Sequence, residues 1–211
     1  ALAKTAWAFA KAGLGETALF ENVAEKALAQ MRHFDAAALS DVAWAFYTAG
    51  VEHPPLFQAV AMEAVKKMET FSPQQLTNTC WTFSMANHPA PEFFAAAEHQ
   101  ASPKLVDFGA RNLAKFAWAL WKAGAGPELL KDISAVITPG LDQCAPQHVA
   151  NLVRALASTA NTRPKQNLFR AVSVQVLVKV RRCLAAPRSG PTRQRRTLKS
   201  GVRLPRQGAS F

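Results

Sequence analysis

The chain has 211 residues, 49% of them hydrophobic and 18% charged, which allows a sizeable buried core and excludes a largely disordered protein. No apolar run approaches the roughly 18 residues that a membrane-spanning helix requires, so we expect no transmembrane segment. The formal net charge of +11 is not spread evenly: residues 1–163 carry 13 Lys and Arg against 14 Asp and Glu, whereas residues 164–211 carry 12 basic residues and no acidic one.

A phrase centred on a tryptophan recurs along the chain. Its copies are TAWAFAKAG at residues 5–13, VAWAFYTAG at 42–50, TCWTFSMAN at 79–87 and FAWALWKAG at 116–124. A fifth copy, VANLVRALASTA from Val149, has Arg154 in the tryptophan position. A fixed period of about 20–50 residues is typical of a solenoid. The period of 37 residues therefore predicts about five repeats, which start near residues 2, 39, 76, 113 and 149.

The phrase has the pattern of an amphipathic helix. In the second copy, Leu39, Val42, Ala43 and Phe46 fall at positions i, i+3, i+4 and i+7, which places them on one face. Asp35 and Ser72 are plausible N-caps for the helices that follow them. A residue suited to end a helix closes each of the four tryptophan phrases: Gly13, Gly50, Asn87 and Gly124.

A second helical segment lies between the tryptophan phrases. Its copies are LFENVAEKALAQM from Leu19, LFQAVAMEAVKKM from Leu56, FFAAAEHQ from Phe93, LLKDISAVI from Leu129 and LFRAVSVQVLVKV from Leu168. Prolines precede several of these segments, where a first helical turn tolerates them. Pro139 and Gly140 predict a short, interrupted helix in the fourth repeat.

Each repeat is therefore predicted to be helix, turn, helix, turn. One helical hairpin cannot bury its apolar face alone, so neighbouring repeats must stack and share a core. We expect an all-α fold, an α-solenoid of about five 37-residue helix-turn-helix repeats over residues 1–184, followed by a disordered basic tail over residues 185–211.

The recurring aromatic residues have two interpretations. Large aromatics at helical spacing usually belong to a core, which favours a role in packing between repeats. The alternative is that the tryptophans offer a flat ring to a stacked base. Arg154 in the last tryptophan position predicts that this end of the array faces solvent. The residues to which we assign a packing role are Trp7, Trp44, Trp81, Trp118, Phe9, Phe46 and Phe83.

Two positions of the first helix vary in chemistry from repeat to repeat. Three residues before the tryptophan position stand Lys4, Asp41, Asn78, Lys115 and Asn151, and seven residues further on stand Lys11, Thr48, Met85, Lys122 and Ser158. Positions seven apart share a helix face, so stacked repeats would align them in two stripes. Helical-repeat proteins read single-stranded RNA with such stripes, one base per repeat. The alternative is that these residues are ordinary solvated positions.

The repeat also resembles a known family. The phrase L-x-N/K-x-x-W-A-F-A-x-A-G, followed by P-x-L-F-x-A-V in a period of 37 to 38 residues, is similar to octotricopeptide repeats and to the helical repeats of FAST kinase-domain and RAP-domain proteins. This resemblance covers residues 1 to about 184. It implies an α-solenoid of mitochondria or chloroplasts that binds an organellar transcript or ribosomal RNA and acts in RNA stability, processing, splicing, translation or rRNA maturation. It also implies that the variable first-helix residues contact bases: Lys4, Asp41, Asn78, Lys115, Asn151, Lys11, Thr48, Lys122 and Arg154.

The carboxy-terminal tail has its own expected role. From Ala185 onward it carries seven basic residues and no acidic one, a composition that does not bury enough apolar surface to fold. It would add salt-dependent attraction for RNA phosphates, or it is a plain charged tail without such a role. The candidate phosphate contacts are Arg193, Arg195, Arg196 and Lys199.

The sequence gives little support for catalysis. It has no Gly-rich phosphate loop, no HExxH and no GxSxG motif, and its cysteines and histidines lack the spacing of a zinc site or a disulfide framework. We therefore expect no enzyme, no cofactor, no metal, no small-molecule substrate and no membrane partner. The favoured function is an organellar adaptor that binds single-stranded RNA. The alternative is a protein-binding scaffold, favoured by the nearly neutral charge of residues 1–163.

Overall fold

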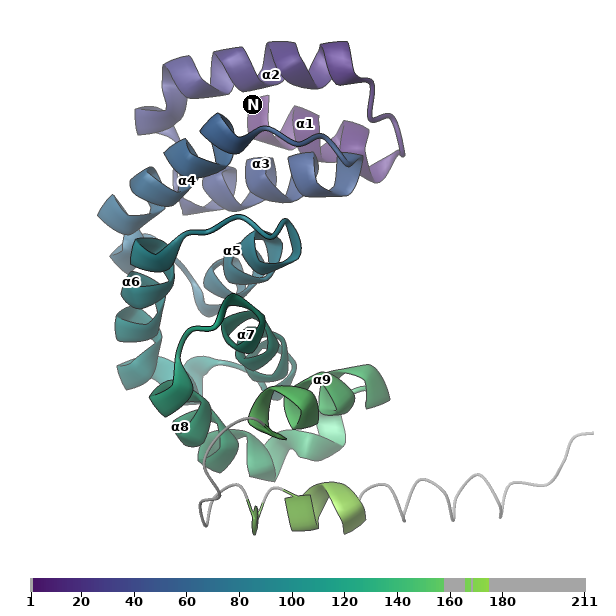
Figure 1. The fold of residues 1–211 in the computed structure, drawn as a ribbon, viewed down its shortest axis with the longest axis vertical. Helices are drawn as coiled ribbons and strands as arrows, with labels where there is room; N and C mark the ends of the chain where they lie inside the picture. Colours follow the sequence, from purple (N-terminus) through teal and green to yellow (C-terminus); the bar gives the residue numbers. More distant parts are fainter. Residues whose placement is uncertain (1, 158–165, 168, 175–211) are drawn as a thin grey trace, which may run out of the picture.

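Two rows of helices run side by side through the protein (Figure 1). The computed structural model describes residues 2–157, 166, 167 and 169–174, and within this part the chain forms helices and turns but no strand. The first helices of the repeats form an inner row: α1 (Leu2–Lys11), α3 (Ala36–Ala49), α5 (Pro73–Met85), α7 (Ala110–Ala123) and α9 (Pro146–Ala157). The second helices form an outer row: α2 (Thr17–Gln30), α4 (Pro54–Lys66), α6 (Pro91–Ala101) and α8 (Pro127–Ile137).

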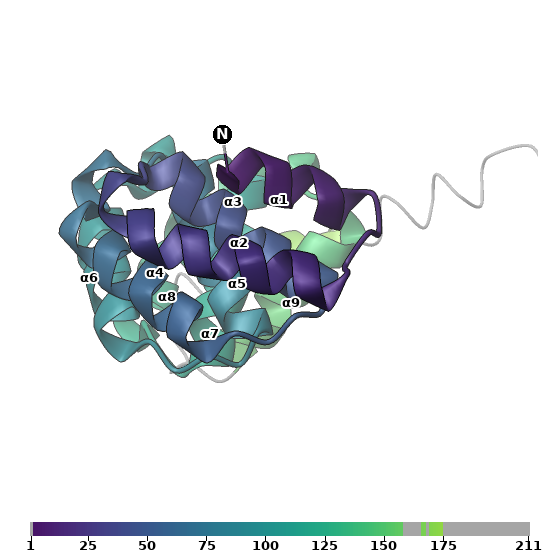
Figure 2. The same ribbon diagram turned by 90° about the horizontal axis from the view of Figure 1, so that it is seen from above.

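The stack is curved, with the inner row on its concave side (Figure 1). Successive inner helices pack against one another in chain order, and each outer helix packs against the inner helix that precedes it. Figure 2 shows the stack from above, with α2 and α4 beside α1 and α3. The prediction of an all-α fold built from stacked helical hairpins is confirmed. No helix among the described residues is long and apolar enough to cross a membrane.

The predicted tail and the end of the fifth repeat lie outside the described residues. The boundary at residue 184 therefore stays a prediction. The same holds for the residues assigned there, which are Ser158, Arg193, Arg195, Arg196 and Lys199.

Local signals in the sequence set the helix ends. The Asp35 carboxylate accepts a hydrogen bond from the Ala38 backbone N–H at 2.8 Å, which caps α3. Ser72 and Gln75 form a reciprocal capping box at the start of α5. A left-handed backbone conformation follows each of the first four inner helices, as expected for a C-terminal stop: Gly13, Gly50, Asn87 and Gly124.

A short 3-10 turn follows each outer helix, a feature that the sequence analysis missed. The turns are η1 (Met31–His33), η2 (Met68–Thr70), η3 (Ser102–Asp107) and η4 (Thr138–Gln143). Each turn buries one apolar side chain, at Met31, Met68, Leu105 and Leu141. Pro139 and Gly140 belong to such a turn. The helix before it, α8, is 11 residues long, which is the length of α6. The predicted interruption is therefore a property of every described repeat and not of the fourth alone.

Aromatic contacts join the second repeat to the first and the third repeat to the second. The ring of Phe46 on α3 meets Phe20 on α2 edge-on at 5.1 Å between centroids, and Phe83 on α5 meets Phe57 on α4 in the same manner at 5.5 Å. Phe46 and Phe83 are completely buried. The packing role assigned to Phe9 stays a prediction; Phe9 holds the same position in α1 and is 36% exposed. No outer helix precedes α1 among the described residues.

A half-buried lysine also ties two repeats together. The Lys67 ammonium donates to the carbonyl oxygens of Arg32 and Phe34, both at 2.7 Å, and pairs with the Glu63 carboxylate at 3.0 Å. Its three N–H donors thus have three acceptors. The hydrogen bond from Lys67 lowers the pKa of the Glu63 carboxyl, against the effect of its burial, and Lys66 lowers it further. Two of these acceptors lie at the η1 turn, so Lys67 holds the second repeat on the first.

We expect Phe46→Ala to lower the free energy of unfolding by about 3–5 kcal/mol, because it opens a cavity between two repeats. Phe9→Ala, at the equivalent but partly exposed position, should cost less than about 1 kcal/mol. Urea unfolding followed by tryptophan fluorescence measures both changes. Equal losses would contradict the repeat-on-repeat packing described above.

Lys67→Met should lower the free energy of unfolding by about 1–3 kcal/mol, because two carbonyl oxygens and a buried carboxylate lose a hydrogen-bond donor. Lys66→Met is the matched control, since Lys66 has a side chain that is 65% exposed and contacts only Glu63. Lys66→Met should change the free energy of unfolding by no more than about 0.5 kcal/mol. Thermal unfolding measures the stability of both variants. If Lys66→Met is as unstable as Lys67→Met, Lys67 does not hold the two repeats together.

Candidate nucleic-acid interface

Equivalent residues of successive inner helices contact one another. The Lys115 ammonium donates to the Asn78 side-chain oxygen at 2.8 Å, and the Lys122 ammonium lies 3.7 Å from the Met85 sulfur. Both pairs are 37 residues apart, which is the repeat period. Trp7 and Trp44 are also one period apart, with ring centroids at 5.8 Å. The stripes expected from the sequence are therefore rows of neighbours, which we call the inner face.

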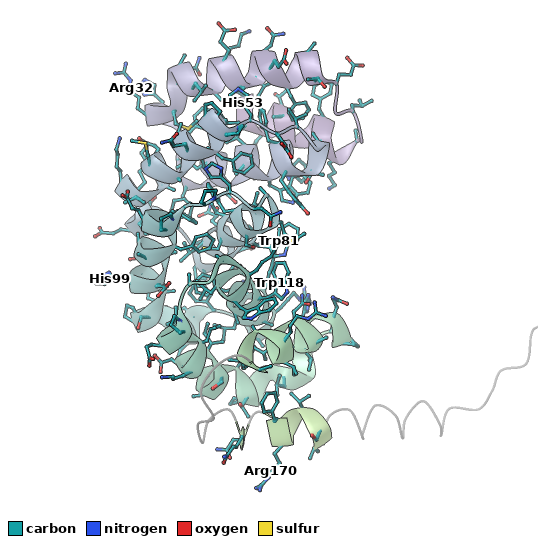
Figure 3. The ribbon with its side chains drawn as sticks, in the orientation of Figure 1. Arg32, His53, Trp81, His99, Trp118 and Arg170 are labelled. Atoms are coloured by element: carbon teal, nitrogen blue, oxygen red, sulfur yellow. The ribbon has the colours of Figure 1, made fainter. Side chains whose placement is uncertain are left out.

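The residues of the inner face differ in exposure. Five of the candidate base contacts are exposed: Lys4, Lys11, Thr48, Lys122 and Arg154. Four are half-buried: Asp41, Asn78, Lys115 and Asn151. Trp81 and Trp118 lie toward the concave side of the curve (Figure 3). A ligand that approaches the inner face would contact the exposed cations first and then the half-buried polar groups below them.

Lysines cover the tryptophan rings. The ammonium of Lys11 lies 4.5 Å from the ring centroid of Trp7, that of Lys115 lies 4.6 Å from Trp81, and that of Lys122 lies 5.5 Å from Trp118. All four repeated tryptophans are half-buried. These cation–π contacts compete with a stacked base for the ring face. The arrangement favours packing over base stacking for the tryptophans.

Lys115 is the most constrained cation of the inner face. It is held between Asn78 and Trp81, and burial lowers the pKa of its ammonium group. Charges from Arg111 and Lys115 add to burial in lowering the pKa of His148 on α9. Positive charge is therefore concentrated where α7 faces α9.

A hollow of about 360 Å³ lies at the other end of the inner face. Its lining includes Lys4, Asp41, Asp35 and His33. Burial raises the pKa of the Asp41 carboxyl, the Lys4 charge opposes that shift, and the Asp35 charge adds to it. The hollow thus offers a donor and an acceptor to a polar group of about the size of a nucleobase edge.

The two rows of helices carry opposite charge. The five inner helices contain six basic residues and one acidic residue, a net of +5. The four outer helices contain three basic and seven acidic residues, a net of −4. The nearly neutral total for residues 1–163 therefore conceals a positive inner row and a negative outer row. The sequence analysis missed this separation because it summed charge along the chain and not by helix row.

The described residues show no group suited to hold a metal ion. Cys80 and Cys144 are both buried, and burial raises the pKa of the Cys80 thiol above its usual range. A thiol of this kind is a poor nucleophile.

The comparisons with known proteins name one family. The family model for RNA-editing substrate-binding complex 6 protein (RESC6) matches residues 1–189. No curated protein matches the chain. The family found is not the octotricopeptide-repeat or FAST kinase-domain family that the tryptophan phrase resembles. The sequence interpretation was thus correct in assigning the chain to RNA metabolism, but the specific family was a different one.

Asp41 provides a pH-dependent test of the inner face. Since its pKa is raised in the folded protein, its ionisation destabilises the native state once the pH rises through that pKa. We expect Asp41→Asn to be more stable than the wild type at pH 7, with the difference shrinking as the pH falls below the usual value of 3.8. Asp132→Asn, at an exposed position on α8, is the control and should show little difference at either pH. Thermal unfolding as a function of pH measures this, and a wild type more stable than Asp41→Asn at pH 7 would contradict it.

Proposed function

Since the chain belongs to the RNA-editing substrate-binding complex 6 protein family, we propose that it binds single-stranded RNA along its inner face as a non-catalytic component of mitochondrial RNA editing. The RNA is the substrate of the editing machinery, and the chain holds it without changing it. The family name supports a mitochondrial site of action and gives no support to a chloroplast one.

The separation of charge between the two rows carries this proposal. Phosphates of a single strand are attracted to the inner row and repelled by the outer row. The exposed cations Lys4, Lys11, Lys122 and Arg154 are spread from the first to the last inner helix. An RNA strand that follows the concave side would contact cations at both ends of the stack.

The half-buried polar residues would then contact the bases of the strand. The side chains of Asp41, Asn78 and Asn151 carry oxygen acceptors, and those of Asn78 and Asn151 also carry amide donors, all of which suit hydrogen bonds to base edges. Because each repeat carries one such side chain, the RNA strand would make one base contact per repeat. Thr48 lies beside them as a hydroxyl donor and acceptor. In this proposal Lys115 acts indirectly, because it orients the Asn78 side chain.

The basic tail has a secondary role in the proposal. Its Arg193, Arg195, Arg196 and Lys199 add phosphate attraction that does not depend on sequence. The scaffold alternative loses its main argument, because the neutrality of residues 1–163 results from two opposite rows and not from an uncharged surface.

Two triple variants of equal charge test the inner face. We expect Lys4, Lys11 and Lys122 changed together to Gln to weaken binding of a single-stranded RNA by about 10- to 50-fold at 150 mM salt and to reduce the salt slope by about 2, since each phosphate contact contributes roughly 0.7. The control changes three exposed lysines outside the inner row, Lys26, Lys66 and Lys104, to Gln. It should bind nearly as the wild type does. Fluorescence anisotropy over a salt series measures both.

Two results would contradict the proposal. One is an equal loss of affinity in both triple variants, which would mean that net charge alone matters. The other is a loss confined to a variant with Arg193, Arg195, Arg196 and Lys199 changed to Gln, which would reduce RNA binding to the tail.

A further inference from the structure

Two hollows lie next to each other on an edge of the stack that adjoins the inner face at Met85. The edge is the side on which inner helices end and outer helices begin, and His53 at the start of α4 marks it (Figure 3). The larger hollow, of about 590 Å³, lies between the α3–α4 and α5–α6 connections and includes Val51 and Phe57. The smaller one, of about 370 Å³, lies between α4 and the start of α6 and includes Met62 and Val65. His88 and Pro89 line both, so we treat them as one surface, the double hollow.

The double hollow is apolar and holds a side chain that the core does not use. Met62 is 56% exposed, although Leu56, Phe57 and Val60 on the same helix are buried in the core. Contiguous exposed apolar patches mark sites of contact with another molecule, and Met62 lies with Ala61 and Val65 in the lining of the smaller hollow. The part of the chain that the structure describes leaves Met62 exposed.

The floor of the double hollow is built from aromatic contacts. The rings of Phe57 and His88 lie 5.6 Å apart, and those of Phe83 and His88 lie 5.9 Å apart. The connection that carries His88 passes through Asn87, which has a left-handed φ of 51° where the other repeats use glycine. A surface with a fixed floor loses little conformational freedom when a ligand binds.

Charge decides the kind of ligand. No lysine or arginine lines either hollow, whereas the exposed Glu52 lines the larger one and the exposed Glu92 the smaller one. Burial lowers the pKa of His88, which leaves its ring neutral near pH 7. The outer helices beside the hollows, α4 and α6, contain one basic and three acidic residues, a net charge of −2. This environment repels the phosphates of RNA and attracts a cationic polypeptide.

We propose that the double hollow docks a basic segment of a partner protein that places one apolar side chain in each hollow and its lysines or arginines over Glu52, Glu92 and the outer helices. This function is additional to RNA binding and uses a different surface. It gives the chain one side for a nucleic acid and another for a protein subunit.

The first test is peptide selection against the full 211-residue chain. We expect random dodecapeptides displayed on phage, selected at about 150 mM salt, to enrich sequences with two apolar residues flanked by Lys or Arg. The resynthesised peptides should bind Met62→Glu at least about tenfold more weakly than the wild type. Leu28→Glu is the matched control, because Leu28 is also an exposed apolar residue of an outer helix but lines neither hollow. It should bind the peptides normally.

Competition separates this surface from the inner face. The Lys4, Lys11 and Lys122 triple variant should keep its peptide affinity, and single-stranded RNA should not displace the peptides. The proposal is overturned if no peptide is enriched, if the enriched peptides are acidic, or if Met62→Glu and Leu28→Glu bind equally well. It is also overturned if RNA displaces the peptides and Met62→Glu weakens RNA binding, since the surface would then belong to the RNA.

Discussion

The packing of an inner-helix ring against the preceding outer helix is the contact on which the rest of the structure depends. Phe46 on Phe20 and Phe83 on Phe57 repeat at the same register and fix the second repeat on the first and the third on the second, while the buried Leu120 and Leu156 take the equivalent position in α7 and α9. Because the register is constant, residues 37 positions apart become neighbours on the concave side. The inner face is thus a consequence of the way in which the repeats stack.

Constant register also explains the distribution of charge. Each repeat supplies one helix to each row, so a preference for basic residues in first helices and acidic residues in second helices adds up along the stack. The same feature gives the protein two chemically different surfaces. The inner row suits a polyanion, and the edge beside the outer row suits a cationic polypeptide. A subunit of an RNA-binding complex needs both kinds of contact.

Local features of the fold could be predicted from the sequence, and features that depend on tertiary neighbours could not. The caps at Asp35 and Ser72 and the left-handed stop at Asn87 follow from residue chemistry within one turn. The exposure of Phe9 could not be predicted, because it depends on which helices pack against α1 in the folded protein. The lysine cover of the tryptophans joins residues 34 positions apart in one case, Trp81 and Lys115, and four apart in the others.

Two missed features did leave a signal in the sequence. Met31, Met68 and Leu105 recur at 37 residues and mark the 3-10 turns, and the charges of the two helix types differ once they are counted separately. The double hollow left no such signal, since Met62 and His88 come together only when the second and third repeats stack.

The path of the RNA is the central claim, and photo-crosslinking tests it most directly. Single-stranded RNA that contains 4-thiouridine would be crosslinked to the full chain, and the attached peptides would be identified by mass spectrometry. We predict crosslinks on several inner helices, from α1 through α7 and α9, and few on α2, α4, α6 and α8. Crosslinks confined to the outer helices or to residues 185–211 would contradict an inner-face path.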